Sequence, residues 1–87
     1  LITVALTVEF TVEPFVAGEP GPHVRAAIDA AEGSGLAVDV GPFGTSMSGD
    51  DARVLDAVDA VVRAAVAAGA TRVSLQLVRD GHAGARP

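Results

Sequence analysis

The sequence contains no cysteine and no lysine, and each absence excludes a class of protein. Without thiols, the chain cannot form disulfides or thiolate zinc sites. Its six basic residues are all arginines, scattered along the chain and outnumbered by eleven acidic residues, for a formal charge of −5. This balance argues against nucleic acid as a partner. An acidic surface tolerates a small cation, although negative charge alone also serves solubility.

Long apolar runs are also missing, because Asp, Arg or Gly interrupts each one too early for a membrane span. The apolar residues 1–8 lack a basic leader and a cleavage site, so we expect no signal peptide and a cytoplasmic protein. With 87 residues, 49% of them hydrophobic, we expect one domain over residues 1–80 with a modest core. Residues 81–87 have no apolar pattern and are expected to form a flexible tail.

The spacing of apolar residues predicts four strands and two helices. Period-two alternation is typical of a half-buried strand, and an i, i+3, i+4, i+7 stripe is typical of an amphipathic helix. Pro22 is well suited to the first helical position, and the glycines at 33 and 35 favour the end of that helix. The predicted elements are strand 1–13, a helix from 22 to these glycines, strand 36–40, strand 45–48, helix 51–68 and strand 72–79.

The second helix has the longer apolar stripe. We expect it to begin at Ser48 or Asp50, where Ser48 and Asp51 resemble a capping box and Asp50 is a good cap. Gly69 is expected to end the helix, and an Asp59–Arg63 ion pair is expected on its outer face. The predicted buried positions are Val54, Val58, Val61 and Ala65, widened by Leu55, Val62 and Val66.

The order strand, helix, strand, strand, helix, strand predicts an α+β fold of the ferredoxin-like βαββαβ type. Such a fold has a four-stranded antiparallel sheet with two helices on one face. Nothing in the chain is left to cover the other face, so a second copy or a ligand is expected to do so. The side chains predicted there are polar: Thr7, Glu9, Thr11, Asp39, Ser74 and Gln76.

No set of residues supports catalysis, so we expect a protein that is not an enzyme. His23 and His82 have no spaced partners for a metal site, and we expect both to be exposed to solvent. Ser46 and Ser48 have no nearby general base, and the hairpin glycines match neither a P-loop nor a dinucleotide fingerprint.

Binding is the better prediction, and Glu9 is its centre. Flanked by Thr7 and Thr11, its carboxylate could accept hydrogen bonds from an amine. It could equally be an edge or interface residue that blocks aggregation. In the hairpin, Phe43 could stack on a flat ring or simply pack. The hairpin hydroxyls, with Asp50, could hold a small polar ligand or make a turn and a cap.

Several short segments together resemble the YkoF-type thiamine-binding family, formerly a domain of unknown function. They are Val8-Glu9-Phe10-Thr11-Val12-Glu13-Pro14, Ser34-Gly35-Leu36, Pro42-Phe43-Gly44-Thr45, Gly49-Asp50 and Gly69-Ala70-Thr71-Arg72-Val73. The resemblance implies a ferredoxin-like fold, assembly into homodimers or homotetramers through the open sheet face and edges, and binding of thiamine or its hydroxymethylpyrimidine moiety without catalysis or a cofactor. The matching positions are Glu9, Phe43, Gly44, Thr45 and Gly49.

On this resemblance, the aminopyrimidine of the ligand would donate to Glu9, its hydroxyl would meet Thr45 or Ser48, and its cationic ring would suit an acidic site. The chain departs from the family pattern at Ser48, where a Glu is common, and at Val62-Arg63, where a His-Glu pair is frequent. A self-associating regulatory module without a ligand is the alternative. The candidate ligand-binding residues are Glu9, Thr11, Phe43, Gly44, Thr45 and Ser48.

Overall fold

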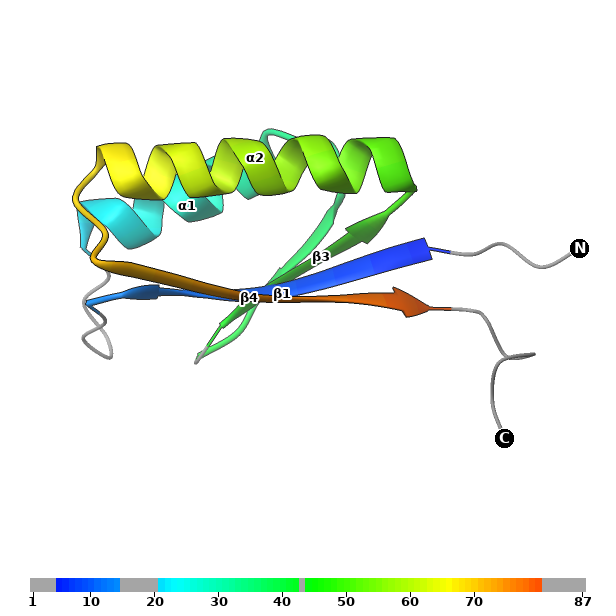
Figure 1. The fold of residues 1–87 in the computed structure, drawn as a ribbon, viewed down its shortest axis with the longest axis horizontal. Helices are drawn as coiled ribbons and strands as arrows, with labels where there is room; N and C mark the ends of the chain where they lie inside the picture. The colour runs from blue at the N-terminus through cyan, green and yellow to red at the C-terminus, as the bar shows by residue number, and fades with distance from the viewer. Residues whose placement is uncertain (1–4, 15–20, 43, 81–87) are drawn as a thin grey trace, which may run out of the picture.

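A four-stranded sheet carries two helices on one face in the computed structural model, which describes residues 5–14, 21–42 and 44–80 (Figure 1). The strands lie in the order β2-β3-β1-β4, and every neighbouring pair is antiparallel. This arrangement confirms the predicted ferredoxin-like α+β fold. The elements are β1 (Ala5–Glu13), α1 (Pro22–Glu32), β2 (Ala37–Val40), β3 (Thr45–Gly49), α2 (Asp51–Ala67) and β4 (Arg72–Asp80).

Strand β1 lies in the middle of the sheet, and its alternating side chains separate the two faces. Leu6, Val8, Phe10 and Val12 are all buried and form the centre of the core beneath the helices. Glu9, Thr11 and Glu13 are exposed on the opposite face. The period of two in the sequence therefore identified correctly which residues of this strand enter the core.

The ends of the helices follow local chemistry. Helix α1 begins with Pro22 at its first position, as predicted. Of the two glycines predicted to end it in a left-handed conformation, Gly35 has a φ of 81°, whereas Gly33 stays helical with a φ of −71°. After helix α2, Gly69 takes a φ of 103°, which confirms its predicted role.

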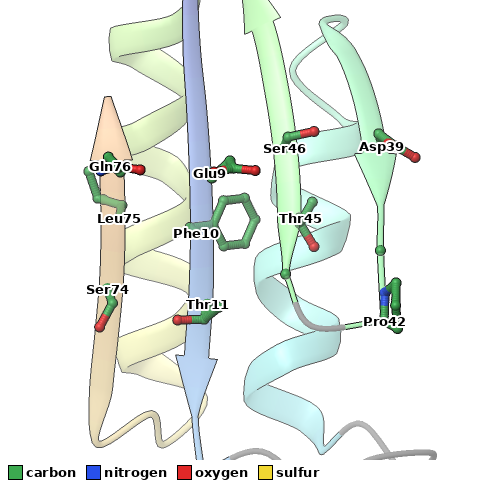
Figure 2. A pocket seen from close by; sticks show the side chains of 12 residues that line it. Glu9, Phe10, Thr11, Asp39, Pro42, Thr45, Ser46, Ser74, Leu75 and Gln76 are labelled. Carbon is green, nitrogen blue, oxygen red and sulfur yellow. The ribbon is translucent and has the colours of Figure 1, made fainter. Parts of the chain in front are cut away.

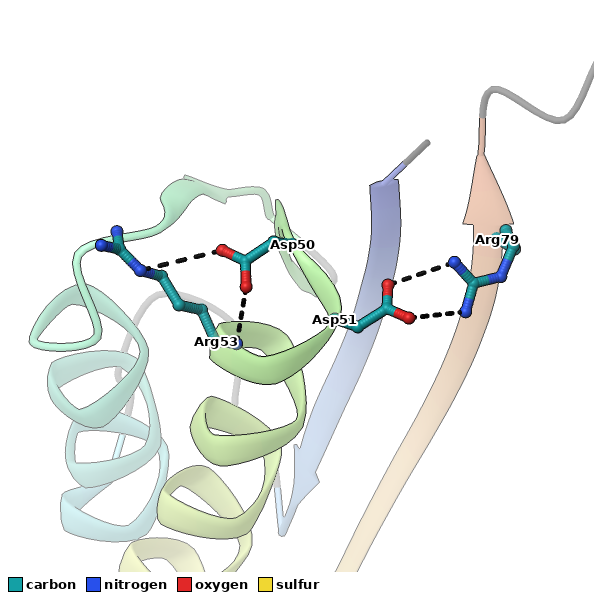
Figure 3. A network of polar contacts seen from close by, with 4 residues as sticks. All are labelled: Asp50, Asp51, Arg53 and Arg79. Carbon is teal, nitrogen blue, oxygen red and sulfur yellow. Dashed lines mark hydrogen bonds and ion pairs between the residues drawn. The ribbon is translucent and has the colours of Figure 1, made fainter. Parts of the chain in front are cut away.

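Asp50, rather than Ser48, caps the start of α2. Its carboxylate accepts a hydrogen bond from the backbone N–H of Arg53 at 3.2 Å (Figure 3). This bond satisfies one of the N–H groups that the first helical turn leaves without a partner inside the helix. Further along α2, the predicted Asp59–Arg63 pair forms on the exposed side, with an N–O distance of 2.9 Å.

The buried stripe of helix α2 is narrower than the sequence suggested. The prediction that Leu55 and Val66 enter the core is wrong, because they are 54% and 60% exposed. Within the sheet, α2 packs mainly on β1 and β3. The side of α2 that faces the edge strand β4 therefore has few residues packed against it. The residues of α2 that are buried are Val54, Ala57, Val61 and Ala65.

Strand β4 is an edge strand of the sheet, and several of its apolar side chains are left exposed. Leu75 and Leu77 pair in register with buried β1 residues and share their helix-facing side, yet they are 40% and 41% exposed. Val78 is 47% exposed on the opposite face. An edge strand with exposed apolar residues on both faces is open to pairing with another chain.

One ion pair ties this edge to the helical layer. The guanidinium of Arg79 donates two hydrogen bonds to the carboxylate of Asp51, at 3.1 and 3.0 Å (Figure 3). These hydrogen bonds, reinforced by the opposite charge, lower the pKa of the Asp51 carboxyl below its ordinary value of 3.8. The pair joins the start of α2 to the far end of β4.

Gly49, at the end of β3, leaves room for a core side chain. A Cβ at this position would lie 2.4 Å from Cδ2 of Leu36, which packs against the core from the loop before β2. The absence of a side chain at Gly49 therefore lets Leu36 close this end of the sheet.

None of the helices in the described ranges is long and apolar enough to cross a membrane.

Candidate functional site

The face of the sheet away from the helices is polar, and pairing across the strands orders its side chains into rows. Residues directly opposite one another in an antiparallel sheet point to the same side. One row crosses all four strands: Asp39 lies opposite Ser46, Ser46 opposite Glu9, and Glu9 opposite Gln76. The register thus confirms the predicted polar face, and no described element covers it (Figure 1).

A hollow of about 530 Å³ opens on this face, beside the hairpin that joins β2 and β3 (Figure 2). Phe10, Thr45 and Leu75 belong by register to the helix-facing side, so their backbone forms the floor of the hollow. The side chains above this floor come mainly from the polar row and from the next row along. The full lining is Glu9, Phe10, Thr11, Asp39, Gly41, Pro42, Gly44, Thr45, Ser46, Ser74, Leu75 and Gln76.

The hairpin forms one wall of the hollow, and its glycines keep that wall thin. The N–H of Gly41 donates to the carbonyl of Gly44 at 2.8 Å, which closes the turn. A Cβ at Gly44 would lie 3.3 Å from the carbonyl oxygen of Phe10 and 3.4 Å from Cγ2 of Thr11. A side chain at Gly44 would therefore crowd β1 at the edge of the hollow.

Both charged side chains among the described residues that line the hollow are negative. Glu9 and Asp39 are exposed carboxylates, and neither makes a hydrogen bond or ion pair with another residue in the part of the chain that the structure describes. None of the described residues that line the hollow is an arginine or a histidine. Two unpartnered carboxylates surrounded by hydroxyl and amide groups can accept hydrogen bonds from an amine or face a cation.

The described residues of the same face offer no arrangement typical of a metal centre. Among residues 5–14, 21–42 and 44–80, no three His, Cys, Asp or Glu side chains come together in a way that could hold a metal ion. His23, predicted to be exposed, is half-buried, and its Nε2 lies within hydrogen-bonding distance of the carbonyl of Pro14. His82 falls outside the described residues.

The structure brings together three of the six predicted ligand-binding residues. Glu9, Thr11 and Gly44 all line the hollow with atoms on the open face. The side chain of Thr45 is only 5% exposed and points to the helix-facing side, opposite Phe10, so only its backbone reaches the hollow. The prediction that its hydroxyl is available there therefore does not fit this geometry.

The other two predicted residues are less informative. Ser48 lies on the open face opposite Thr7, one row away from the polar row, and does not line the hollow. Phe43 lies outside the described residues. Ser46, Gln76 and Asp39 line the hollow but were not among the predicted site residues. The alternation of side chains along their strands would have been enough to predict Gln76 and Asp39. Ser46 could be predicted only with the register of the β2–β3 hairpin.

Comparison with known proteins identifies relatives of this chain. A family model described as thiamine-binding protein matches residues 8–85. A search of curated proteins found no match. A solved structure from Bacillus cereus, of the domain of unknown function DUF77, is 29% identical with a TM-score of 0.65, and the alignment covers 86% of this chain and 73% of that one.

Two further solved structures share the fold. A Thermotoga maritima protein, proposed as a thiamine biosynthesis/salvage protein, is 30% identical with a TM-score of 0.55, over 92% of this chain and 86% of that one. A hypothetical protein from Methanocaldococcus jannascii has a TM-score of 0.65 at 22% identity, over 87% and 78% of the two chains. At this identity, the last structure supports the fold alone.

Proposed function

Since this chain belongs to the thiamine-binding protein family, we propose that it binds thiamine, or the hydroxymethylpyrimidine moiety of thiamine, in the hollow on the open sheet face and does not convert it. One observation carries the proposal. Among the described residues that line the hollow, the charged side chains are those of Glu9 and Asp39, and neither is neutralised by a described residue. Such a hollow suits a ligand that combines an amine with a positive charge.

The chemistry of thiamine matches these groups. Its aminopyrimidine can donate a hydrogen bond to Glu9, and Thr11 and Ser74 offer hydroxyls in the neighbouring row. Its thiazolium ring is a permanent cation, which the negative hollow attracts. A volume of about 530 Å³ is within the usual range for sites that bind small molecules. The structure described as a thiamine biosynthesis/salvage protein points in the same direction.

We also propose that the protein works as a homodimer or homotetramer. The exposed Leu75, Leu77 and Val78 on the edge strand β4 support this, as do Leu55 and Val66 on the adjacent side of α2. Pairing of the edge strand with a second copy would bury these residues and satisfy the free backbone groups of the edge. The same surface favours the second candidate function, a self-associating module that binds no small molecule.

Isothermal titration calorimetry separates these two candidates. The protein is titrated with thiamine and with free hydroxymethylpyrimidine, and thermal unfolding is followed at increasing thiamine concentration. A ligand that binds only the folded protein raises the melting temperature, by an amount that corresponds to about 2.7 kcal/mol at 100 times Kd. Heat of binding with a concentration-dependent rise supports the proposal. No heat and no rise at millimolar thiamine would leave the self-associating module as the better account.

Light scattering tests the assembly independently of the ligand. We expect a mass of two or four chains, and we expect Leu77→Lys to shift the protein toward the monomer because it places a charge on the exposed edge. Asp56→Lys serves as a control and should leave the mass unchanged, because Asp56 is exposed on the side of α2 that faces α1 and not β4. A wild-type monomer at high concentration would contradict the proposed assembly.

A further inference from the structure

We propose that Asp39 is a specificity-determining residue that makes the hollow select a cationic, unphosphorylated ligand. The inference rests on the proposed function and deepens it, because it concerns which chemical forms of the ligand the same site accepts. Asp39 is carried by β2, the edge strand opposite β4, and is one of the residues that line the hollow at that edge. No described residue forms an ion pair with it.

The positions of the two carboxylates along one row suit a ligand with two separate ends. Glu9 lies on β1 and Asp39 on β2, with Ser46 of β3 between them. Neighbouring strands lie about 4.8 Å apart, so the Cα atoms of Glu9 and Asp39 stand roughly 10 Å apart across the sheet. Thiamine consists of two rings joined by a methylene bridge. If its amine meets Glu9 and the molecule lies along the row, its cationic ring crosses Ser46 and its hydroxyethyl group approaches Asp39.

A phosphate on that hydroxyethyl group would meet the wrong charge. The phosphorylated ligand brings about −1.5 to −2 charges to the end where Asp39 lies, and none of the described residues that line the hollow has a basic side chain to receive them. Arg72 is on the same sheet face but lies beyond the hollow, directly opposite Glu13. Arg79 is held by Asp51 in the other layer.

The expected discrimination follows from the Coulomb interaction. For charges several ångströms apart near a protein surface, the repulsion is large enough to weaken binding about tenfold, and added salt reduces it. We therefore expect thiamine monophosphate to bind the wild-type protein about tenfold or more weakly than thiamine. The free hydroxymethylpyrimidine does not reach Asp39 in this arrangement, so its affinity should be independent of that residue.

The test compares the wild-type protein with Asp39→Asn by titration calorimetry with thiamine, thiamine monophosphate and free hydroxymethylpyrimidine at low salt. We expect the variant to bind thiamine about three- to tenfold more weakly, hydroxymethylpyrimidine unchanged, and the monophosphate with equal or higher affinity. Asp29→Asn is the matched control, since it removes the same charge from an exposed position on α1, in the other layer. Melting temperatures of the three proteins verify that all of them are folded.

The outcomes separate this inference from the function on which it rests. If the wild-type protein binds neither thiamine nor hydroxymethylpyrimidine, the proposed function fails and the role of Asp39 fails with it. If the wild-type protein binds thiamine but the ratio of thiamine to monophosphate affinity is the same in Asp39→Asn, the role of Asp39 is refuted and the proposed function stands. An equal change in Asp29→Asn would likewise refute it, because the effect would then come from net charge alone.

Discussion

Replacing Glu9 by Gln tests the centre of the candidate site. The substitution keeps the shape of the side chain and one oxygen that can accept a hydrogen bond, but it removes the charge that strengthens a hydrogen bond from an amine. Hydrogen bonds to a charged group contribute about 1.5–3 kcal/mol, and water in the open hollow reduces this, so we expect a loss of about 1–2 kcal/mol in binding. This corresponds to a Kd for thiamine that is about five- to thirtyfold higher.

The same substitution should leave the fold unchanged. Glu9 is exposed and has no hydrogen-bond partner among the described residues, so we expect its free energy of unfolding to change by less than about 0.5 kcal/mol. Titration calorimetry gives the Kd, and chemical denaturation gives the stability. Glu13→Gln is the control, because Glu13 is on the same face of the same strand but outside the hollow. Wild-type affinity in Glu9→Gln, or an equal loss in Glu13→Gln, would show that Glu9 does not contact the ligand.

Three further predictions concern stability, each measured by denaturation. Gly49→Ala should cost about 1–3 kcal/mol, because its Cβ would force Leu36 out of position; an unchanged midpoint would show that Leu36 moves freely. Asp50→Ala should cost about 1 kcal/mol through loss of the helix cap, and no loss would contradict that role. The lowered pKa of Asp51 means that its ion pair stabilises the fold above about pH 4, and that this stabilisation disappears as pH falls through the folded-state pKa. Arg79→Gln should therefore be less stable at neutral pH and should lose less stability on acidification; an identical pH profile would refute this.

The order of the elements could be predicted because each depends on local chemistry. Alternation along β1 showed which of its side chains enter the core, and Pro22 and Gly69 marked helix ends with backbone preferences that need no tertiary contact. The cap of α2 was also predictable, although Ser48 and Asp50 were both reasonable until the structure showed which side chain meets the helix.

Long-range packing set the limit of prediction. The sequence placed Leu55 and Val66 in the core because the apolar stripe of α2 is broad, but the width of the buried side depends on where the helix crosses the sheet. The face occupied by Thr45 depended in the same way on the register of the hairpin, since a shift of one residue moves every side chain to the other side. Cytoplasmic location stays a prediction.

The pairing of Ala5 with Asp80 places the described ends of the first and last strands side by side. A short peptide could therefore join them, and new termini could be opened in the exposed turn around Gly35. Because this junction lies at the opposite end of both strands from the hairpin, such a circular permutant should retain the ligand cavity. The closeness of the two strand ends would also allow two copies of the chain to be fused in tandem. The cavity of one copy could then be altered while the cavity of the other is kept intact.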